Sequence, residues 1–229
     1  MNRRAFLLAA AASASPARIR AGLLGTRHSH AAGKLKTLLD NPDYEVAAVC
    51  EPDPATRKLR ETQALYQGLR FVSQDQLLAD RSIQLVAVEG QAWDNFAAGQ
   101  QVIAAGKHLH LEKPPTHQMA PFRELVEEAR RRNLLLQTGY IWRFHQGFAA
   151  AFEAARQGWL GEVYMLRGVM NTDLNEASRT DIARYAGGMM FELGGHMIDR
   201  VVDLWGRPRE VRSWIKGPDN TLAVLEYER

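Results

Sequence analysis

The sequence predicts an α/β protein in which a doubly wound parallel sheet is followed by an α+β domain with a mainly antiparallel sheet. From residue 19 to residue 137, short aliphatic runs alternate with amphipathic helical stretches. Repeated β-α units with short connections require a parallel sheet that is covered on both faces. After residue 139 the alternation ends. We therefore expect two domains, at residues 17–139 and 140–229.

Composition narrows the class of protein. The 229 residues are 46% hydrophobic and 24% charged, which is the balance of an ordinary globular protein with a sizeable core. The 29 basic residues only slightly outnumber the 26 acidic ones and form no basic stripe, so we expect no nucleic-acid partner. The single cysteine, Cys50, excludes an internal disulfide and a multi-cysteine metal site.

Residues 1–16 have the pattern of a twin-arginine export signal. Arg3 and Arg4 precede a short apolar run, and small residues follow at the A-x-A-like site Ala12-Ser13-Ala14. The apolar run is too short to span a bilayer, and we expect no membrane span. The pattern predicts a periplasmic protein, or a cytoplasmic one if the signal is not functional.

The elements of the first domain follow from hydrophobic spacing. Apolar residues at i, i+4, i+7 and i+8 predict helices, and continuous aliphatic runs predict buried strands. The predicted strands are 19–24, 46–50, 83–88, 108–111 and 134–137. One predicted helix begins near Ala31, and four others cover about 54–66, 74–79, 93–105 and 119–129.

The second domain is predicted to contain a helix at about 147–157 and strands at 163–170, 211–216 and 222–227. A further helix carries one polar stripe, formed by Glu192, His196, Asp199 and Asp203. A carboxylate four residues before a histidine can orient the imidazole and raise its basicity. The glycine pair Gly194-Gly195 would cost about 1 kcal/mol per residue in an ordinary helix, so it indicates that another group approaches closely.

The turn that follows the first strand, Gly25 to His30, contains part of a dinucleotide-binding fingerprint. Gly25 can make the tight turn, whereas Arg27 and His30 occupy the second and third glycine positions of G-x-G-x-x-G. The Arg27 guanidinium and the helix N-terminus can bind a pyrophosphate instead. Glu51 ends the second strand, where a carboxylate accepts hydrogen bonds from the ribose of NAD and repels the extra phosphate of NADP.

Lys113 lies just past the carboxyl end of the strand 108–111, where open α/β sheets place their ligands. Its ammonium can hydrogen-bond a substrate hydroxyl and stabilise a developing oxyanion. Taken alone, Lys113-Pro114 is also compatible with a simple strand end.

Together the motifs identify a family. A β-α dinucleotide domain, Glu112-Lys113-Pro114, the Tyr-x-x-Arg-Phe segment at residues 140–144 and the glycine-rich stretch at residues 187–199 resemble the Gfo/Idh/MocA oxidoreductases. The resemblance runs from about Arg18 to the end of the chain. It implies a Rossmann-type first domain, a nicotinamide cofactor and hydride transfer at a carbinol carbon of a sugar or cyclitol. NAD is expected over NADP.

The resemblance also implies roles for single residues. Lys113 would hold and polarise the reacting hydroxyl, His196 would be the general base, and Glu192 stands where many members carry aspartate. Cofactor-binding residues are expected to be Gly25, Thr26, Arg27, His28, Glu51, Glu112 and Lys113. The substrate pocket is expected to include Tyr140, Arg143 and Asp199, and no metal ligand is expected.

Three features depart from the family pattern. Arg27 and His30 replace fingerprint glycines, and residues 89–93 differ from the family's Thr-Pro-x-x-x-His segment. Family members also continue with more strands after the position of Tyr227, so the second domain is expected to be incomplete. The missing sheet commonly forms the subunit interface, so a homo-oligomer is expected only if that sheet is complete.

Three alternative functions remain open. A relative of the same fold could use NAD transiently to oxidise a sugar and then eliminate a glycosidic substituent. A sugar-binding relative could have lost catalysis, as the altered glycine turn suggests. A metal-dependent hydrolase or isomerase would use Glu192, His196 and Asp199 as ligands.

Overall fold

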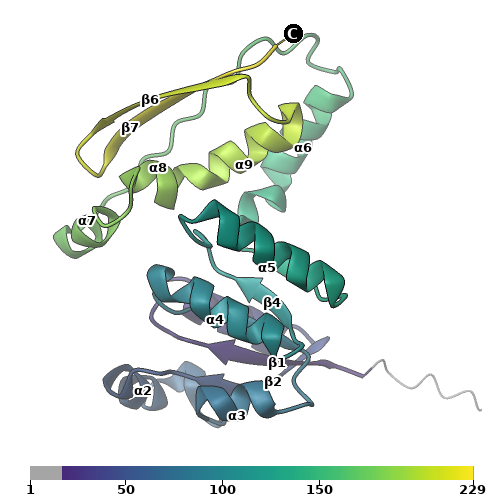
Figure 1. The fold of residues 1–229 in the computed structure, drawn as a ribbon, viewed down its shortest axis with the longest axis vertical. Coiled ribbons are helices and arrows are strands. Elements are labelled where there is room, and N and C mark those ends of the chain that lie inside the picture. Colours follow the sequence, from purple (N-terminus) through teal and green to yellow (C-terminus); the bar gives the residue numbers. More distant parts are fainter. Residues whose placement is uncertain (1–16, 229) are drawn as a thin grey trace, which may run out of the picture. The chain divides into compact units, whose positions relative to one another are not determined.

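The computed structural model describes residues 17–228, and the predicted export signal lies outside them. Within this part, the chain forms two compact units (Figure 1). The first unit combines the chain up to His110 with Leu125–Leu136. The second unit combines Leu111–Glu124 with the chain from Gln137 onward. Lys113 and Glu112 therefore group with the C-terminal part of the sequence.

A five-stranded parallel sheet forms the basis of the first unit, with strand order β2-β1-β3-β4-β5. The strands are β1 Ile19–Leu24, β2 Tyr44–Cys50, β3 Leu85–Val88, β4 His108–Leu111 and β5 Leu136–Thr138. Val49 of β2 also makes an isolated parallel bridge to Phe71. With this bridge counted as a minimal strand, the order is that of the doubly wound dinucleotide-binding fold. The predicted fold class is confirmed.

The helices of this sheet are α1 Ala31–Asp40, α2 Pro54–Glu61, α3 Gln74–Ala79, α4 Ala92–Ala104 and α5 Met119–Arg131. Leu35 of α1 packs with Leu23 of β1, Val49 of β2 and Ala87 of β3 in the buried core. The predicted helix at 54–66 is wrong as one element, because it ends at Glu61 and a 3₁₀ turn, η1, covers Ala64–Tyr66. The backbone of Gln63 is extended, which interrupts the helical hydrogen bonds.

The second unit contains short helices and a hairpin. Its elements are η2 Ile141–Arg143, α6 Gln146–Arg156, α7 Glu176–Ile182, α8 Gly188–Glu192, α9 Gly194–Trp205, β6 Glu210–Lys216 and β7 Asn220–Glu226. The two strands pair in antiparallel fashion with each other, and β7 contacts α8 (Figure 1). No helix in residues 17–228 has both the length and the apolar character needed to cross a bilayer.

Two predictions about the second unit are wrong. Residues 163–170 form no strand, and Tyr164, Met165 and Val169 are exposed there. Local apolar content favours a strand but does not supply the hydrogen-bonding partner that a strand needs. The helix predicted to carry Glu192 through Asp203 is broken at Leu193, between α8 and α9.

Candidate functional site

Gly25 shapes the turn after β1, in the first unit. Its φ of +82° is a backbone conformation that favours glycine, and a Cβ atom at this position would lie 2.5 Å from Gly90 Cα. The turn is therefore closed against the residue that follows Glu89 at the end of β3. This is the tight-turn role that the sequence predicts for the first fingerprint glycine.

Glu51 ties the same turn to the end of β2. The backbone N–H of Thr26 and its hydroxyl both donate to Glu51 Oε2, at 2.7 and 2.6 Å. Glu51 Oε1 accepts a bond from the backbone N–H of Asp53 at 2.9 Å. Thr26 and Glu51 are both buried. The carboxylate thus fixes the turn from within.

Arg60 of α2 adds a second tie that the sequence did not indicate. Its Nη2 donates to the carbonyl oxygen of Thr26 at 2.7 Å. The predicted cofactor residue Thr26 is therefore held through its N–H, its hydroxyl and its carbonyl. Nothing in the spacing of Arg60 distinguishes it from other arginines on α2.

The turn retains groups that suit a dinucleotide pyrophosphate. Arg27 is exposed, and its guanidinium faces the Gln91 side-chain amide. His30 provides no side-chain cap to α1, so the helix begins without a side-chain acceptor on its first N–H groups. A helix N-terminus beside an arginine favours a bound anion. These residues therefore fit the phosphates of a dinucleotide.

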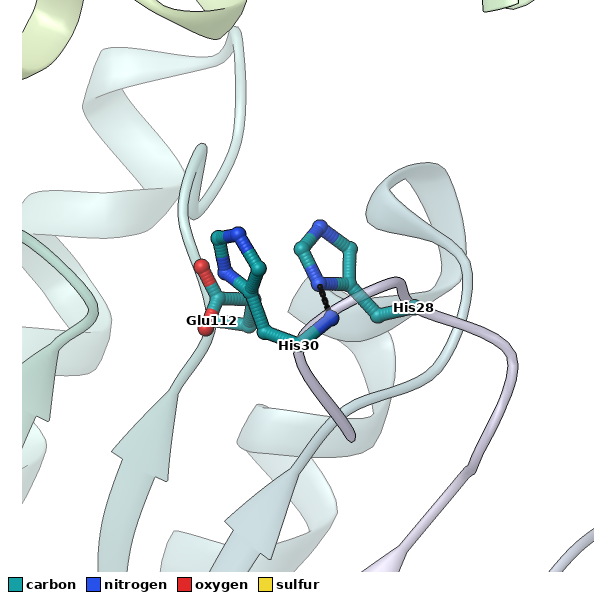
Figure 2. Close-up of side chains that lie close together, drawn as sticks. All are labelled: His28, His30 and Glu112. Atoms are coloured by element: carbon teal, nitrogen blue, oxygen red, sulfur yellow. Dashed lines mark hydrogen bonds between the residues drawn. The ribbon is translucent and has the colours of Figure 1, made fainter. Parts of the chain in front are cut away.

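His28 and His30 lie side by side in this turn (Figure 2). The backbone N–H of His30 donates to His28 Nδ1 at 3.2 Å, and the rings are nearly perpendicular with centroids 4.6 Å apart. The backbone N–H of His28 donates to the carbonyl of Glu89 at 3.0 Å. His28 therefore helps to join the turn to β3.

Lys113 is the central charged group of the second unit. Its side chain is almost completely buried, and its Nζ lies 2.6 Å from Glu192 Oε1 at the end of α8. A buried ammonium is tolerated only with a partner of opposite charge. The structure thus brings together two of the three predicted catalytic residues.

The Glu112 side chain hydrogen-bonds the backbone at Lys113. Its Oε1 accepts a bond from the Lys113 backbone N–H at 2.9 Å. A Cβ atom at Gly139 would lie 2.8 Å from the same oxygen, so the glycine leaves room for this carboxylate. The buried Glu112 therefore helps to set the course of the chain at Lys113.

His196, the third predicted catalytic residue, is buried in the first turn of α9. Its imidazole stacks on the Trp142 ring, with centroids 5.4 Å apart and an interplanar angle of 18°. The Tyr140 ring is perpendicular to it at 5.7 Å. A Cβ atom at Gly195 would lie 3.0 Å from Tyr140 Cε1, so the group that approaches this glycine closely is an aromatic side chain.

Tyr140 is held in its neutral form. Burial, reinforced by the carboxylates of Asp199, Glu192 and Glu112, raises the pKa of Tyr140 from 10.0 to about 12. Its hydroxyl consequently keeps its proton to a higher pH than that of an ordinary tyrosine. A neutral phenol at this position can donate a hydrogen bond.

The other two predicted substrate residues bind each other. Arg143 Nε and Nη2 donate to Asp199 Oδ2 and Oδ1, both at 2.7 Å. This bidentate pair with Asp199 raises the pKa of the Arg143 guanidinium. Their assignment to the substrate pocket stays a prediction.

Trp142 contacts His196 directly, although it is not among the site residues that the sequence predicts. It lies between Tyr140 and Arg143, within the segment used to identify the family. An aromatic residue in this segment could have been predicted as a site residue from the sequence. Its contact with the His196 ring is seen only in the folded structure.

Comparison with known proteins gives the family. A model of the oxidoreductase family's NAD-binding Rossmann domain matches residues 19–140, and a model of the GFO/IDH/MocA C-terminal domain matches residues 148–228. The chain belongs to the Gfo/Idh/MocA oxidoreductase family. The motifs around Lys113 and His196 had indicated the same family, and this prediction is confirmed.

Individual relatives in the Gfo/Idh/MocA family agree. The uncharacterized oxidoreductase YhhX of Escherichia coli is 29% identical over 178 residues, covering 74% of this chain and 51% of the relative. Trans-1,2-dihydrobenzene-1,2-diol dehydrogenase of Macaca fascicularis is 30% identical over 193 residues, covering 82% of this chain and 58% of the relative. The crystal structure of yhhX matches with a TM-score of 0.72 and 26% identity, covering 91% of this chain and 62% of that one. The chain thus spans about half the length of the curated relatives it matches.

The buried pair predicts a strong energetic coupling. We expect Lys113→Met to lower the free energy of unfolding by about 3 kcal/mol, because it leaves the Glu192 carboxylate without its counter-charge. Combined with Glu192→Gln, the loss should be smaller than the sum of the two single losses by at least about 1 kcal/mol. Urea unfolding of the four proteins measures this coupling.

The exposed pair Lys36–Asp40 provides the matched control, because Lys36 Nζ and Asp40 Oδ2 are also 2.6 Å apart. Its cycle of Lys36→Met and Asp40→Asn should give a coupling below about 0.5 kcal/mol. Equal couplings in the two cycles would show that the Lys113 pair has no special environment.

The raised pKa of Tyr140 predicts a loss of stability in alkali. Between pH 10 and about pH 12 the unfolded state loses the phenolic proton while the folded state keeps it, so the free energy of unfolding should fall as pH rises. Tyr140→Phe should reduce this fall, whereas Tyr164→Phe, at an exposed tyrosine, should not. Unfolding curves at several alkaline pH values provide the measurement, and identical slopes for Tyr140→Phe and the unmodified protein would contradict it.

Proposed function

We propose that this chain is an NAD(H)-dependent oxidoreductase that transfers hydride to or from a carbinol carbon of a sugar or cyclitol. The observation that carries the proposal is the buried Lys113–Glu192 pair, with His196 four residues beyond Glu192 along the chain. Membership of an NAD-binding oxidoreductase family supports a nicotinamide cofactor. The Macaca relative is named for a diol, which supports an alcohol as the reacting group.

Glu51 supports the choice of NAD over NADP. Its carboxylate lies at the carboxyl end of β2, where dinucleotide-binding folds place the adenosine ribose. Its bonds to Thr26 and Asp53 hold its negative charge at this position. A fixed negative charge there disfavours the additional phosphate of NADP.

The chain's own residues would handle the proton and the oxygen of the substrate. When bound, the nicotinamide ring supplies the hydride acceptor or donor. Lys113 Nζ, held by Glu192, would donate a hydrogen bond to the substrate oxygen and stabilise negative charge as it develops. His196 would take the hydroxyl proton during oxidation and return it during reduction.

The metal-dependent alternative is disfavoured by the ion pairs. Glu192 bonds to the Lys113 ammonium, and both Asp199 oxygens bond to the Arg143 guanidinium. A metal ion bound by these carboxylates would have to displace two cationic partners. The oxidation–elimination alternative uses the same groups and is separated from simple dehydrogenation only by its products.

Binding and turnover test the proposal together. We expect NAD to raise the melting temperature more than NADP, and a panel of sugars and cyclitols to give NADH with at least one member. Lys113→Ala and His196→Asn should each lower kcat by about 10²- to 10⁴-fold, because each removes a group that acts on the substrate hydroxyl. Lys36→Ala, at an exposed lysine, serves as the control.

Three outcomes contradict the proposal. Absence of any thermal response to NAD or NADP would remove the cofactor claim. Release of an aglycone without net NADH would favour oxidation followed by elimination. Sugar binding that is independent of NAD, with no turnover, would favour the non-catalytic relative.

We also propose that the protein is exported by the twin-arginine route, supported by Arg3, Arg4 and the small residues that follow. In a bacterial host with this pathway, the full chain should appear in the periplasmic fraction. The change Arg3→Lys with Arg4→Lys should retain it in the cytoplasm. Equal fractionation of the two proteins would end this part of the proposal.

A further inference from the structure

Trp142 stacks with two other rings in the second unit. Its indole stacks with Phe148 of α6, with centroids 4.5 Å apart and an interplanar angle of 16°. It also stacks with the His196 imidazole, with centroids 5.4 Å apart and an interplanar angle of 18°. Both neighbouring rings are therefore nearly parallel to the indole.

These contacts place Trp142 beside the predicted general base. The indole is half-buried, and the two rings that it stacks with belong to Phe148 and His196. Trp142 therefore contacts the imidazole directly, and Phe148 packs against the indole in turn.

The stack limits how the imidazole can turn. Rotation of the His196 ring out of its plane would break the parallel contact with Trp142, and Tyr140 stands perpendicular to the ring on another side. The backbone is also restricted, because Gly195 packs against the Tyr140 ring. Two aromatic side chains from a single segment, residues 140–142, thus set the plane of one imidazole.

We propose that Trp142 is a positioning residue that holds the His196 imidazole in the plane in which it exchanges a proton with the substrate hydroxyl. The inference rests on the proposed function for the role of His196, whereas the stack itself does not. Proton transfer requires a nitrogen lone pair directed at the hydroxyl within hydrogen-bond reach. Misplacement of a catalytic group by about 1 Å can lower a rate by roughly 100-fold.

Two substitutions separate positioning from simple packing. Trp142→Phe keeps an aromatic face against the imidazole, whereas Trp142→Leu keeps apolar bulk without one. We expect Trp142→Leu to lower kcat by about 10- to 100-fold with less than a threefold change in KM, because geometry and not substrate affinity is affected. Trp142→Phe should restore most of the rate. Trp159→Leu, at an exposed tryptophan, is the control and should change neither constant.

A spectroscopic measurement tests the stack without any turnover. In the NMR spectrum, the ring current of the indole should displace the His196 carbon-bound proton signals, which His196→Asn identifies by their loss. Trp142→Leu should move these signals toward the position of an unstacked histidine, and Trp142→Phe should move them less. NAD binding should be unchanged in both variants.

The outcomes distinguish this inference from the proposed function. If the unmodified protein binds no dinucleotide but the signals move as described, the proposed function fails and the stack is real but not catalytic. If Trp142→Leu keeps the full kcat, or leaves the His196 signals in place, the positioning role is overturned. If Trp142→Leu does not fold, the result for Trp142→Phe is decisive. Unchanged His196 signals together with an unchanged kcat in Trp142→Phe would overturn the positioning role of Trp142.

Discussion

The bond between the Lys113 ammonium and the Glu192 carboxylate is the constraint on which the second unit depends. It joins residues 79 positions apart in sequence, one just after β4 and the other at the end of α8. Because Lys113 is buried, its charge requires this partner. Glu192 lies two residues before the start of α9, which carries His196. Tyr140 and Trp142 then set the imidazole plane. The proposed acid–base site thus depends on one buried charge that requires a partner.

In the first unit, hydrogen bonds hold the turn that follows β1. A fingerprint with three glycines lets the backbone approach a pyrophosphate and pack closely, but here only the first glycine remains. In place of the two missing glycines, the Glu51 and Arg60 side chains hold Thr26, and a backbone bond joins His28 to Glu89, the residue after β3. Arg27 remains exposed to offer positive charge. The turn with the altered motif is therefore fixed by two side chains and one backbone bond.

The sequence predicted what depends on local pattern. The bounds of β1, α3 and β4 agree with the predictions, because each is a short periodic segment bounded by turn residues or a capping box. The strand at 163–170 failed because strand formation depends on a partner that local pattern does not reveal. The resemblance indicated Lys113, Glu192 and His196, whereas the ring contacts of Trp142 arise only from folding of residues distant in sequence.

The function that we propose for this chain is direct hydride transfer at a carbinol carbon whose hydroxyl contacts Lys113 and His196. The decisive experiment follows deuterium from NADH labelled at C4 of the nicotinamide, with a ketone derived from a sugar or cyclitol as acceptor. We expect deuterium to appear on the new carbinol carbon, from one face of the nicotinamide only. A reduced product that carries no deuterium, or no reduction of any such ketone despite bound NADH, would contradict the claim.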